Sequence, residues 1–355
     1  MNFTKCDIEI IVLFLVLLLL FCFSLKKRDS KSYNKPLAID LDMSFILKGV
    51  ACIFILTGHY VKYTNQILVH GDISKLVYYT TANIGLTWFM FFSGYGLSLK
   101  NKVGKEVFFN RLKKVWLPLL YICCIATILY ALLPNRFSLT EIELYKISPF
   151  INEIKELDFI AIIKSLFGWL DWYVYCIMIF YSIYYLATYI SDKFKISTTI
   201  LLSLFFAVYF IWAYLYFGKE DAHWYRYIWA FLLGHIIAVQ SKISKSQALI
   251  SLLPFVLLIL LESKFMILSY AVAILSLYII SKLGNLYTIR KNTPLLLLGG
   301  LSYYIYLSHL RIGWQIVVYT DFMNLLVFAL ISIIVSYVAM KGYNLIFQDK
   351  ENNIK

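Results

Sequence analysis

Charged residues are scarce in this chain. Only 15% of its 355 residues are Asp, Glu, Lys or Arg, whereas soluble globular proteins carry about 25%. The hydrophobic fraction is 61% and the mean hydropathy is +0.75. These values exclude an ordinary soluble domain and indicate a chain that lies largely within lipid.

Cysteine is also infrequent, and its spacing argues against a metal site. Five of the six cysteines fall in apolar runs, and they do not show the spacing of a zinc ligand set. We therefore interpret them as small buried residues and expect no metal. Internal repeats, low-complexity linkers and a soluble domain are likewise not expected.

Long apolar runs are what the chain has in abundance. A helix of about 20 residues crosses the roughly 30 Å of hydrocarbon in a bilayer. The runs do not alternate in hydrophobicity as the strands of a membrane barrel would. The sequence therefore predicts an all-α, polytopic integral membrane protein with about 10–11 transmembrane helices. The eleven runs lie near 8–25, 44–61, 80–99, 115–133, 167–190, 198–217, 225–240, 247–261, 265–281, 295–318 and 323–341.

The distribution of Lys and Arg predicts the orientation of these helices. The odd-numbered connections and the C-terminus hold 21 basic residues, against 11 in the N-terminus and the even-numbered connections. By the positive-inside rule, loops such as 26–43 and 100–114 face the cytoplasm, with the N-terminus outside and the C-terminus inside. The basic flank "KKRDSKSYNK" after the first run favours a retained helix over a cleaved signal peptide. The net charge of +13 then reflects loops near anionic lipid, and no nucleic-acid partner is expected.

Ionisable side chains inside the predicted spans are the first functional signal. A charged residue there costs at least about 2.5–3.5 kcal/mol, so it usually faces the protein interior or a wet cavity. Near the end of a span, Lys and Arg can instead extend to the interface, which is the ordinary interpretation of Lys48 and Arg311. The candidates are Lys48, His59, Asp171, His235, His309 and Arg311.

Lys48 and His59 occupy one predicted helix, in the stretch "ILKGVACIFILTGHYVKY". Eleven residues at about 100° each bring the second side chain within roughly 20° of the first, about 16 Å along the axis. With the preceding loop in the cytoplasm, Lys48 lies at the cytoplasmic mouth and His59 lies deeper on the same face. A cation at the entrance and a titratable imidazole within suit an anionic donor that has a reactive end.

A second basic pair lies at the predicted cytoplasmic start of the fourth span. In "FFNRLKKVWLPLLY", Arg111 and Lys114 are i, i+3 neighbours on one helix face. The pair could form a phosphate clamp, or it could be part of the ordinary positive-inside charge. The second interpretation fits Lys113 well.

Three features are weaker. Trp172 and Tyr173 open the fifth span, where an aromatic belt at the interface explains both rings. His235 and His309 are lone histidines in apolar surroundings, and such residues are more often packed and satisfied than catalytic.

Several motifs together resemble a known family, the membrane-bound acyltransferase family 3. They are a basic residue and a histidine with ten positions between them, the last of which is glycine, followed in order by "FFSGYGLSL", "FFNRLKKVWLPL", "WLDWYVYCIMIFY", "WYRYIWAFLLGHIIA" and "LSYYIYLSHL". The resemblance covers about 40–340 and implies three regions. These are an extra N-terminal helix with a basic loop (1–35), an acyltransferase-3-like transmembrane domain (36–342) and a short cytoplasmic tail (343–355).

The resemblance implies an O-acetyltransferase in the cell membrane that takes acetyl from acetyl-CoA. Its acceptor would be a hydroxyl of a cell-surface polysaccharide, such as capsule, or of its lipid-linked precursor. By position, His59 falls on the family's essential histidine and Lys48 on its motif arginine. Arg111 and Lys114 fall on a pair that is typically Arg-x-x-Arg. Lysine therefore replaces arginine twice, which keeps the charge and loses the bidentate geometry.

From the residues and the resemblance together, we expect Lys48, Arg111 and Lys114 to bind the donor phosphates. His59 would be a general base or would carry an acetyl-histidine intermediate, and Trp172, Tyr173 and His309 are candidates for the acceptor side. Two other classes of protein stay open. A polysaccharide transporter or polymerase would share the many spans, although a polymerase ordinarily carries a larger outer loop than 134–165. In a non-enzymatic membrane scaffold, the spacing of Lys48 and His59 would be chance.

Overall fold

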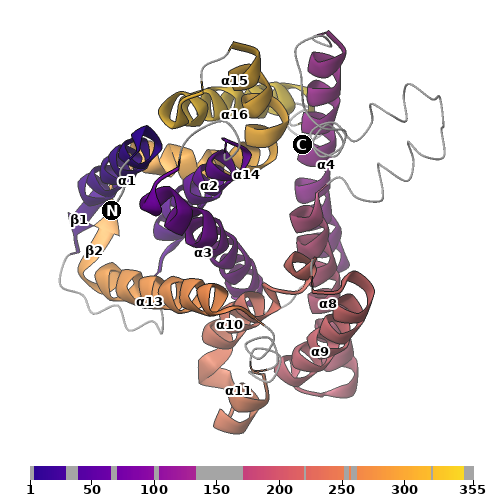
Figure 1. The fold of residues 1–355 in the computed structure, drawn as a ribbon. Coiled ribbons are helices and arrows are strands. Elements are labelled where there is room, and N and C mark those ends of the chain that lie inside the picture. Colours follow the sequence, from indigo (N-terminus) through magenta and orange to yellow (C-terminus); the bar gives the residue numbers. More distant parts are fainter. Residues whose placement is uncertain are drawn as a thin grey trace.

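The structure, a computed structural model, describes residues 4–28, 39–64, 70–99, 104–132, 171–219, 221–251, 256, 262–320 and 323–347. This part of the chain is almost entirely helical (Figure 1). The α-helices are α1 (Lys5–Ser24), α2 (Leu41–Thr64), α3 (Asp72–Ser98), α4 (Lys105–Leu132), α8 (Trp172–Phe194), α9 (Thr198–Phe217), α10 (Ile228–Val239), α11 (Lys245–Ser251), α13 (Lys264–Leu286), α14 (Pro294–Ser308), α15 (Gln315–Thr320) and α16 (Leu325–Phe347). The described residues also form two 3₁₀ turns, η1 (Ala222–Trp224) and η2 (Gln240–Lys242), and one π-helix, η3 (His309–Trp314). They include two short strands, β1 (Leu25–Lys27) and β2 (Tyr287–Ile289).

The helices confirm the predicted class of protein. Among the described residues, seven segments are long and apolar enough to cross a membrane, including one that runs from α14 through η3 into α15. The helices α3 and α4 are as long, with 27 and 28 residues, and begin in more polar turns. The short run near 225–240 forms α10, of 12 residues. Most of the run near 247–261 and the loop 134–165 lie outside the described residues. The chain is therefore an all-α polytopic membrane protein.

Close helix packing places α2 at the centre of the molecule. Figure 1 shows α14 and α16 on one side of α2, α3 and α13 on the other, and α4, α8 and α9 grouped along one flank. Small residues allow the closest contacts, as is usual between membrane helices. A Cβ added at Gly49 would meet the backbone of α14, and one at Gly94 or Gly234 would overlap a carbonyl oxygen across the α3–α10 contact.

Hydrogen bonds of two buried carboxylates gather three helix N-termini at one end of the molecule. Asp7 in α1 accepts hydrogen bonds from the backbone nitrogen and hydroxyl of Ser74 in α3, at 2.7 and 2.5 Å. Glu9 accepts from the backbone nitrogen of Leu325 at 2.9 Å and from the side-chain amide of Asn324 at 2.7 Å. Anionic side chains at helix N-termini are favourable because the unpaired N–H groups point toward them. We call this the far end.

A two-stranded ribbon marks the opposite end. Strand β1 pairs antiparallel with β2, with Leu25 opposite Ile289. The ribbon lies where α1 and α13 end, and α14 begins shortly after it. We call this the ribbon end. Helix α1, which the first apolar run forms, is thereby joined to other parts of the chain at both of its ends.

Candidate active site

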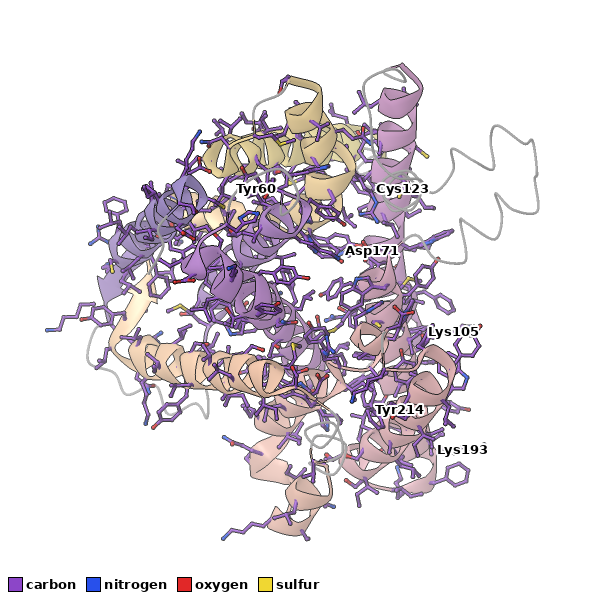
Figure 2. All side chains as sticks on the ribbon, in the orientation of Figure 1. Tyr60, Lys105, Cys123, Asp171, Lys193 and Tyr214 are labelled. Carbon is purple, nitrogen blue, oxygen red and sulfur yellow. The ribbon has the colours of Figure 1, made fainter. Side chains whose placement is uncertain are left out.

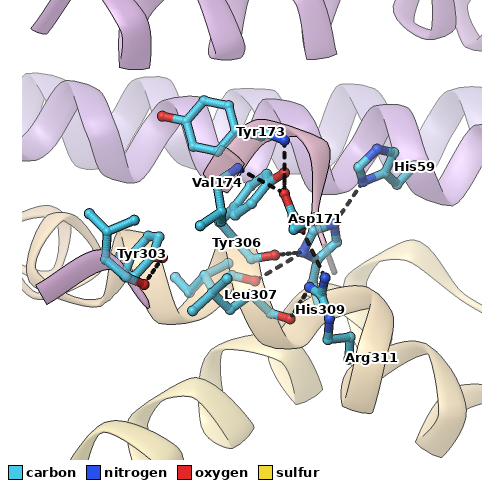
Figure 3. A network of polar contacts seen from close by, with 11 residues as sticks. His59, Asp171, Tyr173, Val174, Tyr303, Tyr306, Leu307, His309 and Arg311 are labelled. Carbon is cyan, nitrogen blue, oxygen red and sulfur yellow. Dashed lines mark hydrogen bonds and ion pairs between the residues drawn. The ribbon is translucent and has the colours of Figure 1, made fainter. Parts of the chain in front are cut away.

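Two histidines from distant parts of the sequence meet at the centre of the site. Nδ1 of His59, in α2, lies 2.7 Å from Nε2 of His309, the first residue of η3. The two imidazole rings are within 6° of parallel, with centroids 5.0 Å apart. The sequence predicted a role for each residue separately, and the structure joins them into a hydrogen-bonded pair (Figure 3).

The remaining contacts of His309 fix which nitrogen carries the proton. Its Nδ1 lies 3.0 Å from the carbonyl oxygen of Ile305 and 2.7 Å from that of Tyr306. Carbonyl oxygens only accept hydrogen bonds, so Nδ1 must carry the proton, and in the neutral ring Nε2 is then an acceptor. We therefore assign the proton between the rings to Nδ1 of His59. In the neutral pair, Nε2 of His59 is left as the basic nitrogen.

Burial separates the roles of the two rings. His309 is 2% exposed, whereas His59 is half-buried. His59 is thus the member of the pair that a substrate can reach. Aromatic side chains flank the pair: the ring centroid of Tyr63 lies 6.2 Å from that of His59, and that of Phe328 lies 6.4 Å from that of His309.

The π-helix that begins at His309 also carries a buried ion pair. Nη2 of Arg311 lies 3.0 Å from Oδ2 of Asp171, and Nη1 donates to the carbonyl oxygen of Leu307 at 3.0 Å. The residue Arg311 is 5% exposed, so it does not extend to the interface as the ordinary interpretation of its sequence position would have it. Figure 2 shows Asp171 between the central helices and the group formed by α4, α8 and α9, whereas Lys193 lies at the outer edge of the molecule.

Two of the predicted donor-binding cations come together toward the ribbon end. Lys48, on α2, and Arg111, on α4, are both half-buried, and Arg111 is close enough for its charge to repel that of Lys48. The ammonium of Lys48 lies 5.7 Å from the ring centroid of Phe45. The guanidinium of Arg111 lies 5.9 Å from that of Tyr181. Two like charges held together in apolar surroundings favour binding of an anion.

The third predicted cation, Lys114, is exposed on α4, next to the exposed Lys113. No described contact joins it to Lys48. As the i, i+3 neighbour of Arg111 it lies one helical turn from one member of the cationic cluster that Lys48 and Arg111 form.

The two aromatic residues at the start of α8 have different surroundings. Tyr173 is buried, with its ring centroid 4.8 Å from that of Tyr306, next to the histidine pair. Trp172 is half-buried and contacts His223, with centroids 4.8 Å apart. Of the two, Trp172 offers a surface that an incoming molecule can contact.

His235 is a packed histidine with both ring nitrogens hydrogen-bonded, as its apolar surroundings in the sequence favour. Its Nδ1 lies 2.8 Å from the hydroxyl of Ser98, and its Nε2 lies 3.0 Å from the hydroxyl of Thr199. Both ring nitrogens are therefore engaged by side chains of neighbouring helices, and the residue is 2% exposed.

The pairing of Asp171 with Arg311 was not predicted from the sequence. Both residues stand out as ionisable groups in apolar runs, but 140 positions separate them. The available signal was their opposite charge, since buried charges are usually paired. That signal does not say which residues pair when several candidates exist.

Comparison with known proteins agrees with the geometry. The family model of an acyltransferase domain, acyltransferase family 3, matches residues 39–341, which include every residue of the site described above. Searches of curated proteins and of solved structures gave no match. Because the family model covers most of the chain, this membrane protein belongs to acyltransferase family 3.

Proposed function

We propose that this membrane acyltransferase transfers an acetyl group from acetyl-CoA to a hydroxyl of a cell-surface polysaccharide or of its lipid-linked precursor. The observation that carries the proposal is the 2.7 Å contact between His59 and His309. It leaves an accessible histidine with an unprotonated Nε2 and fixes its orientation through a second, buried ring. Such an arrangement suits acid–base work on a hydroxyl group.

The orientation proposed for the protein follows from its charges. The connections that form the ribbon, after α1 and after α13, belong to the set that carries most of the Lys and Arg. By the positive-inside rule the ribbon end then faces the cytoplasm, where acetyl-CoA is found. The N-terminus then lies outside and the C-terminus inside, in the cell membrane. In this orientation the cationic cluster opens toward the donor, and the far end faces the acceptor.

The donor would bind along α2. Its phosphates lie against Lys48 and Arg111, with Lys114 at the edge of the cluster, and its pantetheine arm covers the roughly 16 Å that eleven helical residues place between Lys48 and His59. Arg111 has the planar fork that binds two phosphate oxygens at once. Lys48 and Lys114 act as point charges, so they hold the phosphates with less geometric selectivity.

The reaction follows from the protonation of the pair. Nε2 of His59 accepts the proton of the acceptor hydroxyl while the hydroxyl oxygen attacks the thioester carbonyl. The carbon–sulfur bond then breaks, and the departing thiolate takes the proton back from His59. While His59 is positively charged, its Nδ1–H donates to Nε2 of His309 and is stabilised by it. The same Nε2 atom would be the site of an acetyl-histidine intermediate.

The acceptor would approach from the far end. Trp172, at the predicted outer interface, offers a half-buried ring to it, and Tyr173 supports the wall of the site from within. Aromatic faces that lie beside polar groups suit a sugar, which has apolar C–H faces and hydroxyl edges.

The experiment is a complementation test in a strain that lacks the gene. Surface polysaccharide is purified from cells that express wild type, His59→Ala or His70→Ala, and its O-acetyl content is measured by NMR before and after mild base. His70 is a matched control because its described hydrogen bond goes to Thr64, not to the pair. We expect wild type and His70→Ala to restore the acetyl groups and His59→Ala to leave them absent. Equal acetylation by His59→Ala at equal membrane expression would refute the proposal.

A further inference from the structure

The ion pair between Asp171 and Arg311 calls for an explanation other than stability. Their side chains are 10% and 6% exposed. Removing two charges from water is costly, and replacing a buried pair by apolar residues is often neutral or stabilising. A buried ion pair is therefore weak evidence for a role in stability, and we ask instead what this pair orients.

The carboxylate of Asp171 connects α8 to the helix that carries His309 (Figure 3). Oδ1 accepts from the backbone nitrogens of Tyr173 and Val174, at 3.0 and 3.2 Å, and so caps the N-terminus of α8. It also accepts from the hydroxyl of Tyr306 at 2.9 Å, while Oδ2 accepts from Arg311 at 3.0 Å. One side chain thus holds the chain both before and after His309.

Tyr306 and Arg311, which bind Asp171, lie on either side of His309 in the sequence, and His309 accepts the hydrogen bond from His59. Tyr306 lies three positions before His309 and supplies a carbonyl oxygen to its Nδ1. Arg311 lies two positions after it and binds the carbonyl oxygen of Leu307. The direction of the His309 ring therefore depends on backbone that Asp171 holds in place.

The π-helix makes this anchoring necessary. Relative to an α-helix, a π turn includes one extra residue, which rotates the following side chains by about 100°. In a continuous α-helix, Tyr306 and Arg311 would lie about 140° apart around the axis. In the structure Tyr306, in the last turn of α14, and Arg311, in η3, reach the same carboxylate, and this shared partner holds the altered register.

We propose that Asp171 and Arg311 are positioning residues for acyl transfer: their ion pair fixes the π turn so that Nε2 of His309 receives the Nδ1–H of His59. The inference rests on the proposed function, because it assumes that His59 is the reacting base. It assigns Asp171 and Arg311 no contact with either substrate.

The test uses a double variant that separates positioning from stability. Asp171→Asn leaves the charge of Arg311 buried without its partner, so this single variant should lose stability. In Asp171→Asn/Arg311→Met no charge is left over, and asparagine still caps α8 because it ranks with aspartate at this position. A role in stability alone predicts that the double variant recovers both folding and activity, whereas a positioning role predicts that it recovers folding only.

Membrane vesicles from the complemented strain supply the acceptor, and radiolabelled acetyl-CoA is the donor. For the double variant we expect wild-type thermal stability in detergent, a KM for acetyl-CoA within about 2-fold of wild type, and a kcat lowered by about 100-fold, since small misplacements of a catalytic group can cost that much. A double variant with wild-type kcat would overturn the inference. A double variant whose kcat and thermal stability both fall would also overturn the inference, because the loss of activity would then follow from the loss of folding.

Two tyrosines of α14 provide a matched comparison. Tyr306→Phe removes the hydroxyl that binds Asp171, and Tyr303→Phe removes a hydroxyl that binds the carbonyl oxygen of Val115. We expect the first to lower kcat by about 10-fold and the second to leave it unchanged. His59→Ala is assayed in parallel. If it keeps full activity, the proposed function fails together with the inference. If it is inactive while the double variant is fully active, only the inference fails.

Discussion

His235 and His309 are both 2% exposed in the helical bundle, yet they have opposite surroundings. His235 is held by one hydroxyl on each ring nitrogen, from Ser98 and Thr199. His309 binds backbone carbonyls through one nitrogen and a second titratable ring, His59, through the other. Burial alone therefore does not distinguish a structural histidine from a chemical one. The two kinds of histidine are distinguished by the partner of the second ring nitrogen, which is a hydroxyl in His235 and another imidazole in His309.

The neighbourhoods of the two histidines differ in the same way. Around His235, Gly94 and Gly234 bring α3 and α10 into backbone contact, which leaves a tightly packed region. Around His309 there is a π-helix and a buried ion pair. Irregular backbone and buried charge are both costly, and proteins tend to keep such features where function needs them.

The largest effect that this comparison predicts comes from His309→Ala. Without its acceptor nitrogen, the ring of His59 loses both its orientation and the stabilisation of its cationic form. We expect a loss of about 100-fold in kcat, within the usual range for acid–base groups. The rate of label transfer from acetyl-CoA in vesicles checks this, at protein levels matched by fluorescence. Wild-type turnover by His309→Ala would show that the pair is not the chemical centre.

His235→Ala should show the reverse pattern. It leaves a cavity and removes the partner of two buried hydroxyls, so we expect the free energy of unfolding to fall by about 2 kcal/mol. Turnover per folded molecule should stay within about 3-fold of wild type. Thermal melting in detergent and the vesicle assay measure the two quantities. A stable His235→Ala with greatly reduced turnover would reverse the contrast between the two histidines.

Arg111→Ala should have the smallest of the three effects, and on a different kinetic constant. Loss of a charge-assisted contact to the donor phosphates should raise the KM for acetyl-CoA by about 10-fold and leave kcat nearly unchanged. Lys113→Ala, which removes an exposed charge from the same helix, is the control and should change neither constant. Initial rates over a range of acetyl-CoA concentrations decide the result. A fall in kcat with an unchanged KM would place Arg111 in the chemistry.

Most of the architecture could be predicted from the sequence because the bilayer imposes a simple rule. Spanning helices must be about 20 residues long and apolar, so α1, α2 and α9 begin and end close to the predicted runs, and α16 begins close to its run. The predictions were least accurate where helices extend beyond the apolar run. The helix α3 begins at Asp72 and α4 at Lys105, eight and ten residues before the predicted spans, because their first turns are polar.

The site was only partly predictable, for two physical reasons. Residues on one helix, such as Lys48 and His59, are related by helical geometry that the sequence encodes directly. The contact between His59 and His309 joins positions 250 residues apart, and nothing local specifies it. The π turn adds a second obstacle, because α-helical periodicity places Tyr306 and Arg311 on different faces of the helix. Their shared partner, Asp171, appears only in the folded structure.

The most direct test of the account compares His59→Ala with His235→Ala in the same vesicles. Each removes one imidazole from the bundle, so differences in turnover per folded molecule report the role of the ring. The account predicts that His59→Ala keeps less than about 1% of wild-type acetyl transfer, since acid–base groups contribute about 10²–10⁴-fold, while His235→Ala stays within about 3-fold of wild type. Equal turnover by the two variants would contradict it.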